Sequence, residues 1–258
     1  MARPNNTSRY YSGQGICLMG VRDGATGKPM GMVPIGNVPE LTISIEQTTE
    51  EHKESWSGQR AVDVVLATET TVTVAITFES FDPDMLALGL LGTVTNNAAA
   101  TETDLEVKVY LDKWTYLDHV SVSNLSFKDA VDAALTLTEG VDVEINAEGG
   151  AIMIKTGNDD GIVDGDTIKV TYDYDTQYDL QALTTAAPER YFILDGLNTQ
   201  DSNKPVRLEI FRLQTQPFTG LGFINDGIAQ ASVSATALAD ATRSGAGISS
   251  FFREIIAD

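Results

Sequence analysis

Residues 41–78 read LTISIEQTTEEHKESWSGQRAVDVVLATETTVTVAITF and indicate the fold class of this chain. Apolar and polar residues alternate from Leu41 to Glu46, and the same alternation returns from Thr71 to Glu79. A period of two places successive side chains on opposite faces of a β-strand, so both ends of the stretch are predicted to be strands. The charged run between them, residues 51–63, is predicted to be a loop that is longer than the roughly two to five residues of an ordinary hairpin turn.

Similar short strands are predicted in much of the rest of the chain. They lie at 105–111, 119–123, 141–145, 151–155, 167–174, 191–196 and 205–213. Residues 82–92 are predicted to form a helix instead, because Asp82 can cap its first turn, Pro83 suits its first position and Gly92 can end it. The sequence therefore predicts a mainly β chain with one flanking α-helix.

The middle of the chain differs in composition from the rest. Residues 101–188 hold 18 acidic and 5 basic residues, and so carry most of the formal net charge of −20. Their predicted strands are short and are separated by turns rich in Gly and Asp. We therefore predict two domains: a discontinuous β core of residues 1–100 and 189–258, and a small acidic β module, residues 101–188, inserted in that core.

Charge, cysteine content and hydropathy argue against several classes of protein. Affinity for nucleic acid comes mostly from Lys and Arg, so a chain with 37 acidic and 17 basic residues is not predicted to bind it specifically. Cys17 is the only cysteine, which rules out an intramolecular disulfide and a Cys-based zinc cluster. The sequence shows neither a signal peptide nor an apolar run of about 18 residues, so synthesis in a cytoplasm and no membrane partner are expected.

No catalytic motif is evident, and the chain is predicted not to be an enzyme and to use no cofactor or metal. His52, Lys53 and Glu54 have the H-x-E spacing of zinc deaminases, but the later P-C-x-x-C of that signature is missing. GQGICLMG, residues 13–20, does not have the glycine spacing of a dinucleotide-binding fingerprint.

An aspartate-rich segment, NDDGIVDGD at residues 158–166, admits two interpretations. Its four carboxylates are hard oxygen donors of the kind that calcium prefers, and they belong to Asp159, Asp160, Asp164 and Asp166. Asp-Gly pairs are also typical of tight turns, and the spacing does not match an EF-hand. A set of turns and a weak ion site are the alternatives here.

Two segments resemble a known family. PIGNVPELTISIEQTTEEHKESWSGQRAVDVVLATETTVTVAITFESFDPDMLALGLLG, residues 34–92, looks like the N-terminal half of the tail tube (major tail) proteins of long-tailed bacteriophages. The shared features are an N-V-P start, an E-H-K-E-S-x-S/T-G-Q loop, a second strand pair and a helix of A-L-x-L-x-G character. YFILDGLNTQDSNKPVRLEIFRL, residues 191–213, resembles the F-x-G-x-N segment of that family and the long strand that follows it.

The resemblance implies a β-sandwich or barrel-like core with a flanking helix, closed with other copies of the chain into a ring, commonly a hexamer. Such rings stack into the hollow tube of the phage tail, which the tape-measure protein fills before genome DNA passes through the lumen without specific binding. The resemblance also implies tail terminator or tip proteins as partners. It further implies synthesis in the cytoplasm of a host bacterium and a final location in the virion tail.

Within that family setting, the loop at 51–63 is predicted to leave its own subunit and reach a neighbour. The residues predicted to make this self-assembly contact are Glu51, His52, Lys53, Glu54, Trp56, Gln59 and Arg60. Exposed ion pairs contribute only about 0 to 1 kcal/mol each, so Trp56 is expected to supply most of the energy and the charges to set the register. A flexible solvated hairpin tip is the alternative for the loop, and a surface-exposed calcium-binding β-sandwich adhesin is the alternative for the whole protein.

Overall fold

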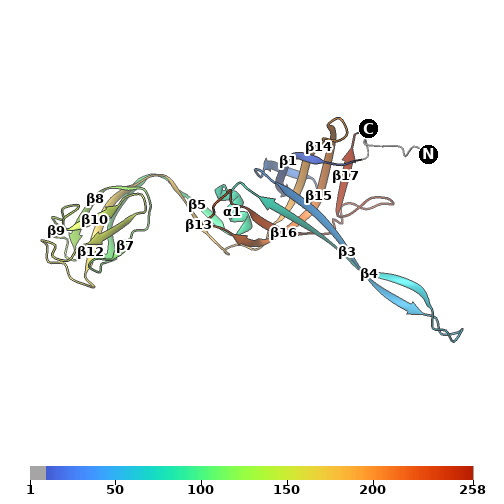
Figure 1. Ribbon diagram of the computed structural model, residues 1–258, viewed down its shortest axis with the longest axis horizontal. Coiled ribbons are helices and arrows are strands. Elements are labelled where there is room, and N and C mark those ends of the chain that lie inside the picture. The colour runs from blue at the N-terminus through green and yellow to red at the C-terminus, as the bar shows by residue number, and fades with distance from the viewer. Residues whose placement is uncertain (1–9, 258) are drawn as a thin grey trace. The chain divides into compact units, whose positions relative to one another are not determined.

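The computed structural model describes residues 10–257. This part of the chain contains seventeen β-strands and one short α-helix, so the predicted mainly β, sandwich-like fold class is confirmed. Its strands pair in antiparallel sheets (Figure 1). No helix among these residues is long and apolar enough to span a membrane.

The chain divides into two compact units. The first unit contains the described residues up to Val94 and from Leu180 onward, and the second contains Thr95–Asp179. The chain enters the second unit through β5 (Thr93–Asn97) and leaves it through β13 (Gln177–Gln181), and these two strands pair as a two-stranded sheet.

The sequence placed the boundaries of the second unit later, at residues 101 and 188. Segment 182–188, ALTTAAP, is rich in small residues and looks like a linker, but backbone hydrogen bonds hold it in the first unit. The N–H of Leu183 donates to the carbonyl of Leu90 at 3.0 Å, and the N–H of Thr185 donates to the carbonyl of Leu91 at 2.9 Å.

The first unit is built on one eight-stranded sheet in the order β2-β1-β14-β15-β16-β4-β3, with β17 also paired to β15 (Figure 1). Its strands are β1 (Gly13–Arg22), β2 (Pro29–Pro34), β3 (Glu40–Lys53), β4 (Val62–Phe78), β14 (Glu189–Asn198), β15 (Lys204–Leu221), β16 (Ala231–Ala237) and β17 (Phe252–Ile256). The strands at the two ends of this order are β2 and β3, and each has a partner on one side only.

Alternation along β4 builds the core of the first unit. Val72, Val74, Ile76 and Phe78 are buried, whereas the residues between them are exposed or partly exposed. Burying one such apolar side chain contributes roughly 1.5–3 kcal/mol, so the four residues together are a large part of what fixes this strand in the sheet. The same core takes buried side chains from β1, β14, β15 and β16.

The helix α1 (Pro83–Gly89) is shorter than the predicted 82–92. Its start is as predicted, because Asp82 caps it by accepting a hydrogen bond from the N–H of Met85 at 2.8 Å. Its end differs, because Leu91 takes the left-handed conformation with φ 49°, and the N–H of Gly92 bonds the carbonyl of Ala87 at 2.7 Å. This hydrogen bond is typical of a Schellman helix end, and here the left-handed residue is Leu91, directly before Gly92.

Close contact between Gly89 and Phe218 seats α1 on β15. A Cβ atom at Gly89 would lie 2.0 Å from the Phe218 ring, so only glycine fits there. The Phe218 ring also makes edge contacts with Phe78 and Phe81, with centroid separations of 6.3 and 6.5 Å. At Gly89 the helix backbone therefore contacts the sheet directly, and the side chains of Met85 and Leu88 pack against the core.

Two buried carboxylates cross-link distant parts of the first unit. Arg22 donates to Asp240 at 2.6 and 3.2 Å, and Arg253 donates to Glu209 at 2.8 Å. The hydroxyl of Tyr191 also donates to Glu209, at 3.0 Å. Burial raises the pKa of Asp240, but the hydrogen bonds from Arg22 and from Thr242 outweigh burial and lower it to about 2.

The second unit is a small β-sandwich with its own core. Its two sheets have the orders β6-β12-β8-β9 and β10-β11-β7. The strands are β6 (Ala100–Lys108), β7 (Trp114–Tyr116), β8 (Val122–Asp129), β9 (Ala134–Leu135), β10 (Val143–Asn146), β11 (Ala151–Ile154) and β12 (Thr167–Tyr174). Ile168, Val170 and Tyr172 of β12 alternate into the core and are buried there together with Ile152 and Ile154 of β11.

Candidate self-assembly surface

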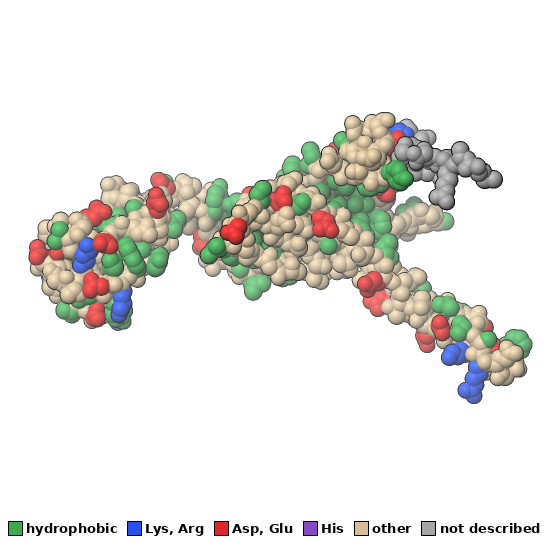
Figure 2. All heavy atoms as spheres, in the orientation of Figure 1, with side chains coloured by type: hydrophobic (Ala, Val, Ile, Leu, Met, Phe, Trp, Pro, Cys, Tyr) green, Lys and Arg blue, Asp and Glu red, His purple; other side chains and the backbone are tan. Residues whose placement is uncertain are grey.

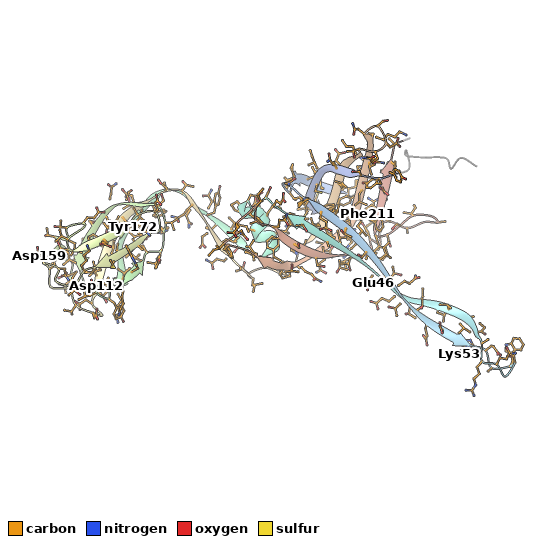
Figure 3. All side chains as sticks on the ribbon, in the orientation of Figure 1. Glu46, Lys53, Asp112, Asp159, Tyr172 and Phe211 are labelled. Carbon is orange, nitrogen blue, oxygen red and sulfur yellow. The ribbon has the colours of Figure 1, made fainter. Side chains whose placement is uncertain are left out.

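A long hairpin of β3 and β4 extends from the sheet of the first unit (Figure 1). β4 pairs with β16 only from Val72 to Phe78, and Val72 faces Ile45 on β3. Beyond this point, residues 46–71 have only each other as hydrogen-bonding neighbours, and we call this segment the arm. Figure 3 shows Glu46 where the arm leaves the sheet and Lys53 close to its tip.

The arm is a strand pair where a loop was predicted. β3 continues to Lys53 and β4 begins at Val62, so the predicted loop at 51–63 is reduced to residues 54–61. Alternation signals a strand only where one face is buried, and every residue of β3 from Glu46 to Lys53 is exposed. The many Thr, Val and Glu residues are compatible with pairing but leave no such pattern.

Two register shifts distort the arm, at Thr48/Thr49 and at His52/Lys53. At the first of them, the hydroxyl of Thr68 donates to the carbonyl of Thr48 at 3.1 Å. Such bulges increase strand twist and interrupt the ladder. A two-stranded ribbon without a third strand is only marginally stable in water, so the arm gains little stability from its own contacts.

Apolar side chains are exposed along β4 of the arm. They are Val62, Val64, Val65 and Leu66, each between 45% and 57% exposed. Four neighbouring branched side chains left in water on a narrow ribbon are a typical feature of a surface that another protein covers.

Glu54 organises the tip of the arm. Its carboxylate accepts hydrogen bonds from the N–H groups of Trp56 and Ser57, at 2.9 and 2.8 Å, and from the hydroxyl of Ser57. The backbone N–H of Glu54 donates to the carbonyl of Ala61 at 2.9 Å, which closes the loop. The hydrogen bonds from Ser57 lower the pKa of Glu54, so the carboxylate stays ionised in this position.

The tip presents Trp56 to solvent. Its side chain is 85% exposed, whereas Glu54 beneath it is 6% exposed. Glu54 was predicted to pair with a neighbouring subunit, but its carboxylate is used within its own loop. The charges that remain free to reach another molecule from this tip are those of Glu51, Lys53 and Arg60, which are all exposed.

Two other predicted site residues make local contacts. His52 Nδ1 lies 2.7 Å from a carboxylate oxygen of Asp63, across the strand pair, and this contact lowers the pKa of Asp63. The backbone N–H of Gln59 donates to the hydroxyl of Ser57 at 3.2 Å. The predicted self-assembly residues are therefore brought together at one end of the arm, where Figure 2 shows Lys and Arg side chains.

Three aspartates of segment 158–166 accept backbone hydrogen bonds, one from within the segment and two from distant residues. Asp160 accepts from the N–H of Thr136 at 2.8 Å, Asp164 from that of Leu111 at 2.7 Å, and Asp166 from that of Val163 at 2.9 Å. Within residues 10–257, no group of three or more His, Cys, Asp or Glu side chains is placed to hold a metal ion. Asp166 therefore acts as a turn residue, whereas Asp160 and Asp164 bind the segment to Thr136 and Leu111.

Sequence reasoning missed a groove of about 450 Å³ in the first unit. Its walls are β1 and β2, the helix α1, and the segment 185–190. The larger apolar side chains of its lining are Met19, Val21, Val33, Met85, Leu88 and Leu91, and Asp84 and Arg190 add one charge of each sign. No sequence signal marks the groove, because its residues come from separate parts of the chain.

Comparison with known proteins identifies the family of this chain. No curated protein matches the chain. One family model covers residues 10–255, which is nearly the whole chain and both units. The chain therefore belongs to the family described as protein of unknown function UCP028589.

Proposed function

We propose that this protein is a structural virion protein that assembles, through its arm, into stacked rings forming the tail tube of a long-tailed bacteriophage. The observation that carries the proposal is the arm itself. Residues 46–71 form a ribbon without a third strand, with exposed apolar side chains and an exposed Trp56 at its end. Contact with another subunit would bury these apolar side chains and so stabilise the arm.

The sheet of the first unit supports the same proposal. β2 and β3 each have one partner, so both edges of the sheet offer unpaired backbone groups. Closing several copies into a ring covers such edges with the next subunit, which removes the risk of uncontrolled edge-to-edge aggregation. We propose a hexameric ring, in line with the tail tube proteins that residues 34–92 and 191–213 resemble.

The net charge of −20 suits a conduit for DNA. A basic wall would hold DNA by releasing counterions from its phosphates, whereas an acidic wall lets it slide. Genome DNA would then pass through the lumen without specific binding. The tape-measure protein and tail terminator or tip proteins would be the other partners, in a virion tail assembled in the host cytoplasm.

Negative-stain electron microscopy of the concentrated full-length protein tests the proposal. We expect rings with a central hole in end-on views and striated tubes in side views. A strictly monomeric sample at every protein concentration and salt concentration tried would overturn it. A gel-shift assay of the tubes with linear DNA is expected to show no stable complex at physiological salt.

A further inference from the structure

The groove beside α1 has the size and lining of a receptor for one large apolar side chain. Large apolar side chains from β1, β2, α1 and the turn after α1 line its 450 Å³ volume. Hydrogen bonds from Leu183 and Thr185 to the end of α1 hold the segment that forms its outer wall. The groove is therefore formed before anything binds, which reduces the entropic cost of binding.

Trp56 is the most exposed tryptophan of the chain, at 85% against 45% for Trp114. A tryptophan buries roughly 150–250 Å² when it is covered, and anchors of this kind dominate the energy of interfaces. The bonds of Glu54 to its loop hold the tip in one conformation, so the anchor is presented ready to dock.

The arm of a chain cannot bring Trp56 into that chain's own groove. The eight residues from Glu46 to Lys53 extend at about 3.4 Å per residue, which places the tip about 27 Å beyond the sheet. Their pairing with β4 along this length keeps the ribbon extended away from the sheet (Figure 1). A second copy of the chain must therefore supply the groove.

The charges at the two surfaces are compatible. Lys53 and Arg60 flank Trp56 at the tip, in a chain that is otherwise strongly acidic. Asp84 is exposed at the start of α1 and lines the groove, so it is available to pair with either cation. Glu51 of the arm is likewise available for Arg190 on the other wall.

We propose that the groove formed by β1, β2, α1 and residues 185–190 of one copy receives Trp56 from the arm of the next copy. This inference rests on the proposed function, since it names the receptor for the arm. The contact joins two different surfaces, so it is heterologous and propagates from copy to copy until a ring closes or a filament grows.

Tryptophan fluorescence measures the docking directly. In a Trp114→Phe variant Trp56 is the only tryptophan, and its emission is expected to shift to shorter wavelength as protein concentration carries the sample from monomer to assembly. Ala186→Arg in the same background places a bulky cation in the groove on an exposed segment. It is expected to abolish the shift and to raise the critical concentration at least about tenfold, whereas Ala182→Arg, exposed on the same segment but outside the groove, leaves both unchanged.

Cysteine cross-linking identifies the pair of surfaces. A Gln59→Cys, Ala186→Cys double variant is expected to give a ladder of disulfide-linked oligomers beyond the dimer, and the Gln59→Cys, Ala182→Cys control is not. The native Cys17 does not interfere, because it is 3% exposed and burial raises its pKa to about 11.

Outcomes of these experiments separate the two proposals. Normal rings and tubes from the Ala186→Arg variant would overturn the groove as receptor. So would the absence of a disulfide ladder from the Gln59→Cys, Ala186→Cys variant. Either result would leave the tail tube proposal standing. Absence of any assembly by the unmodified protein would overturn the tail tube proposal itself.

Discussion

The carboxylate of Glu54 accepts a hydrogen bond from the backbone N–H of Trp56 at 2.9 Å, so a nearly buried acid holds the most exposed tryptophan of the chain in place. The same carboxylate accepts from the N–H of Ser57 at 2.8 Å. In the sequence Glu54 looks like one of several surface charges, but its role is to order the tip of the arm and so to position Trp56.

Replacing Glu54 by Ala is expected to loosen the tip without affecting the core. The loop loses the acceptor for two backbone N–H groups, so trypsin should cleave several-fold faster after Arg60. The melting temperature should change little, because residues 54–61 contribute no side chain to the core of the first unit. Glu51→Ala, which removes an exposed carboxylate of the arm, serves as control and should not change the cleavage rate.

Truncating the anchor should weaken assembly far more than folding. Hot-spot side chains contribute about 2 kcal/mol or more, so Trp56→Ala should raise the critical concentration for tube formation by about 30-fold. Sedimentation across a concentration series gives this value, and a thermal melt monitors the fold. Trp56→Phe keeps an aromatic anchor, so its critical concentration should lie between those of the native protein and Trp56→Ala. Normal tubes from Trp56→Ala would mean that the tip is not an interface.

Removing the whole arm should separate folding from assembly. Glu46 faces Thr71 in the hairpin, so residues 47–70 can be replaced by Asn-Gly, which favours a tight hairpin turn. We expect a circular dichroism melt within a few degrees of the native protein, because the arm contributes no residue to the core. Electron microscopy should show no tubes. A shortened chain that unfolds would show instead that the arm stabilises the sheet.

Acid should weaken the link between Arg22 and Asp240. The folded pKa of Asp240, about 2, is below its unfolded value of 3.8, so its stabilisation is complete above about pH 4 and is lost as pH falls toward 2. This lowering of the pKa corresponds to about 2.5 kcal/mol. Asp240→Asn should cost about 3 kcal/mol at pH 7, because it leaves Arg22 without its buried partner.

Chemical denaturation at several pH values checks this expectation for Asp240. The difference in unfolding free energy between the native protein and Asp240→Asn should narrow between pH 4 and pH 2. Asp226→Asn, which changes an exposed carboxylate, should show no such trend. A difference that stays constant with pH would contradict the assigned role of Asp240.

Chelation should leave the protein unchanged. The carboxylates of Asp160, Asp164 and Asp166 accept hydrogen bonds from backbone N–H groups, and these bonds need no ion. A thermal melt with and without EGTA, in buffer containing calcium, should therefore show the same midpoint. A fall of several degrees on chelation would revive a calcium site at residues 158–166.

Elements that follow local rules were predictable from the chain. Val72 to Phe78 alternate because one face of β4 is buried, and Asp82 and Pro83 begin α1 because they satisfy its first turn. The predicted end of α1 at residue 92 was wrong, because Leu91 takes the left-handed conformation that glycine usually adopts. That conformation is stabilised by the bonds from Leu183 and Thr185, which lie far away along the chain.

The mainly β fold, the start of the helix and the group of residues at the tip of the arm follow from the sequence, because each depends on neighbours within a few positions. That residues 46–71 form an arm, that Glu54 turns inward and that a groove lies beside α1 follows from the folded structure alone. These features depend on which strands lack a partner and on which distant segments meet, and the order of side chains along a single strand does not encode either.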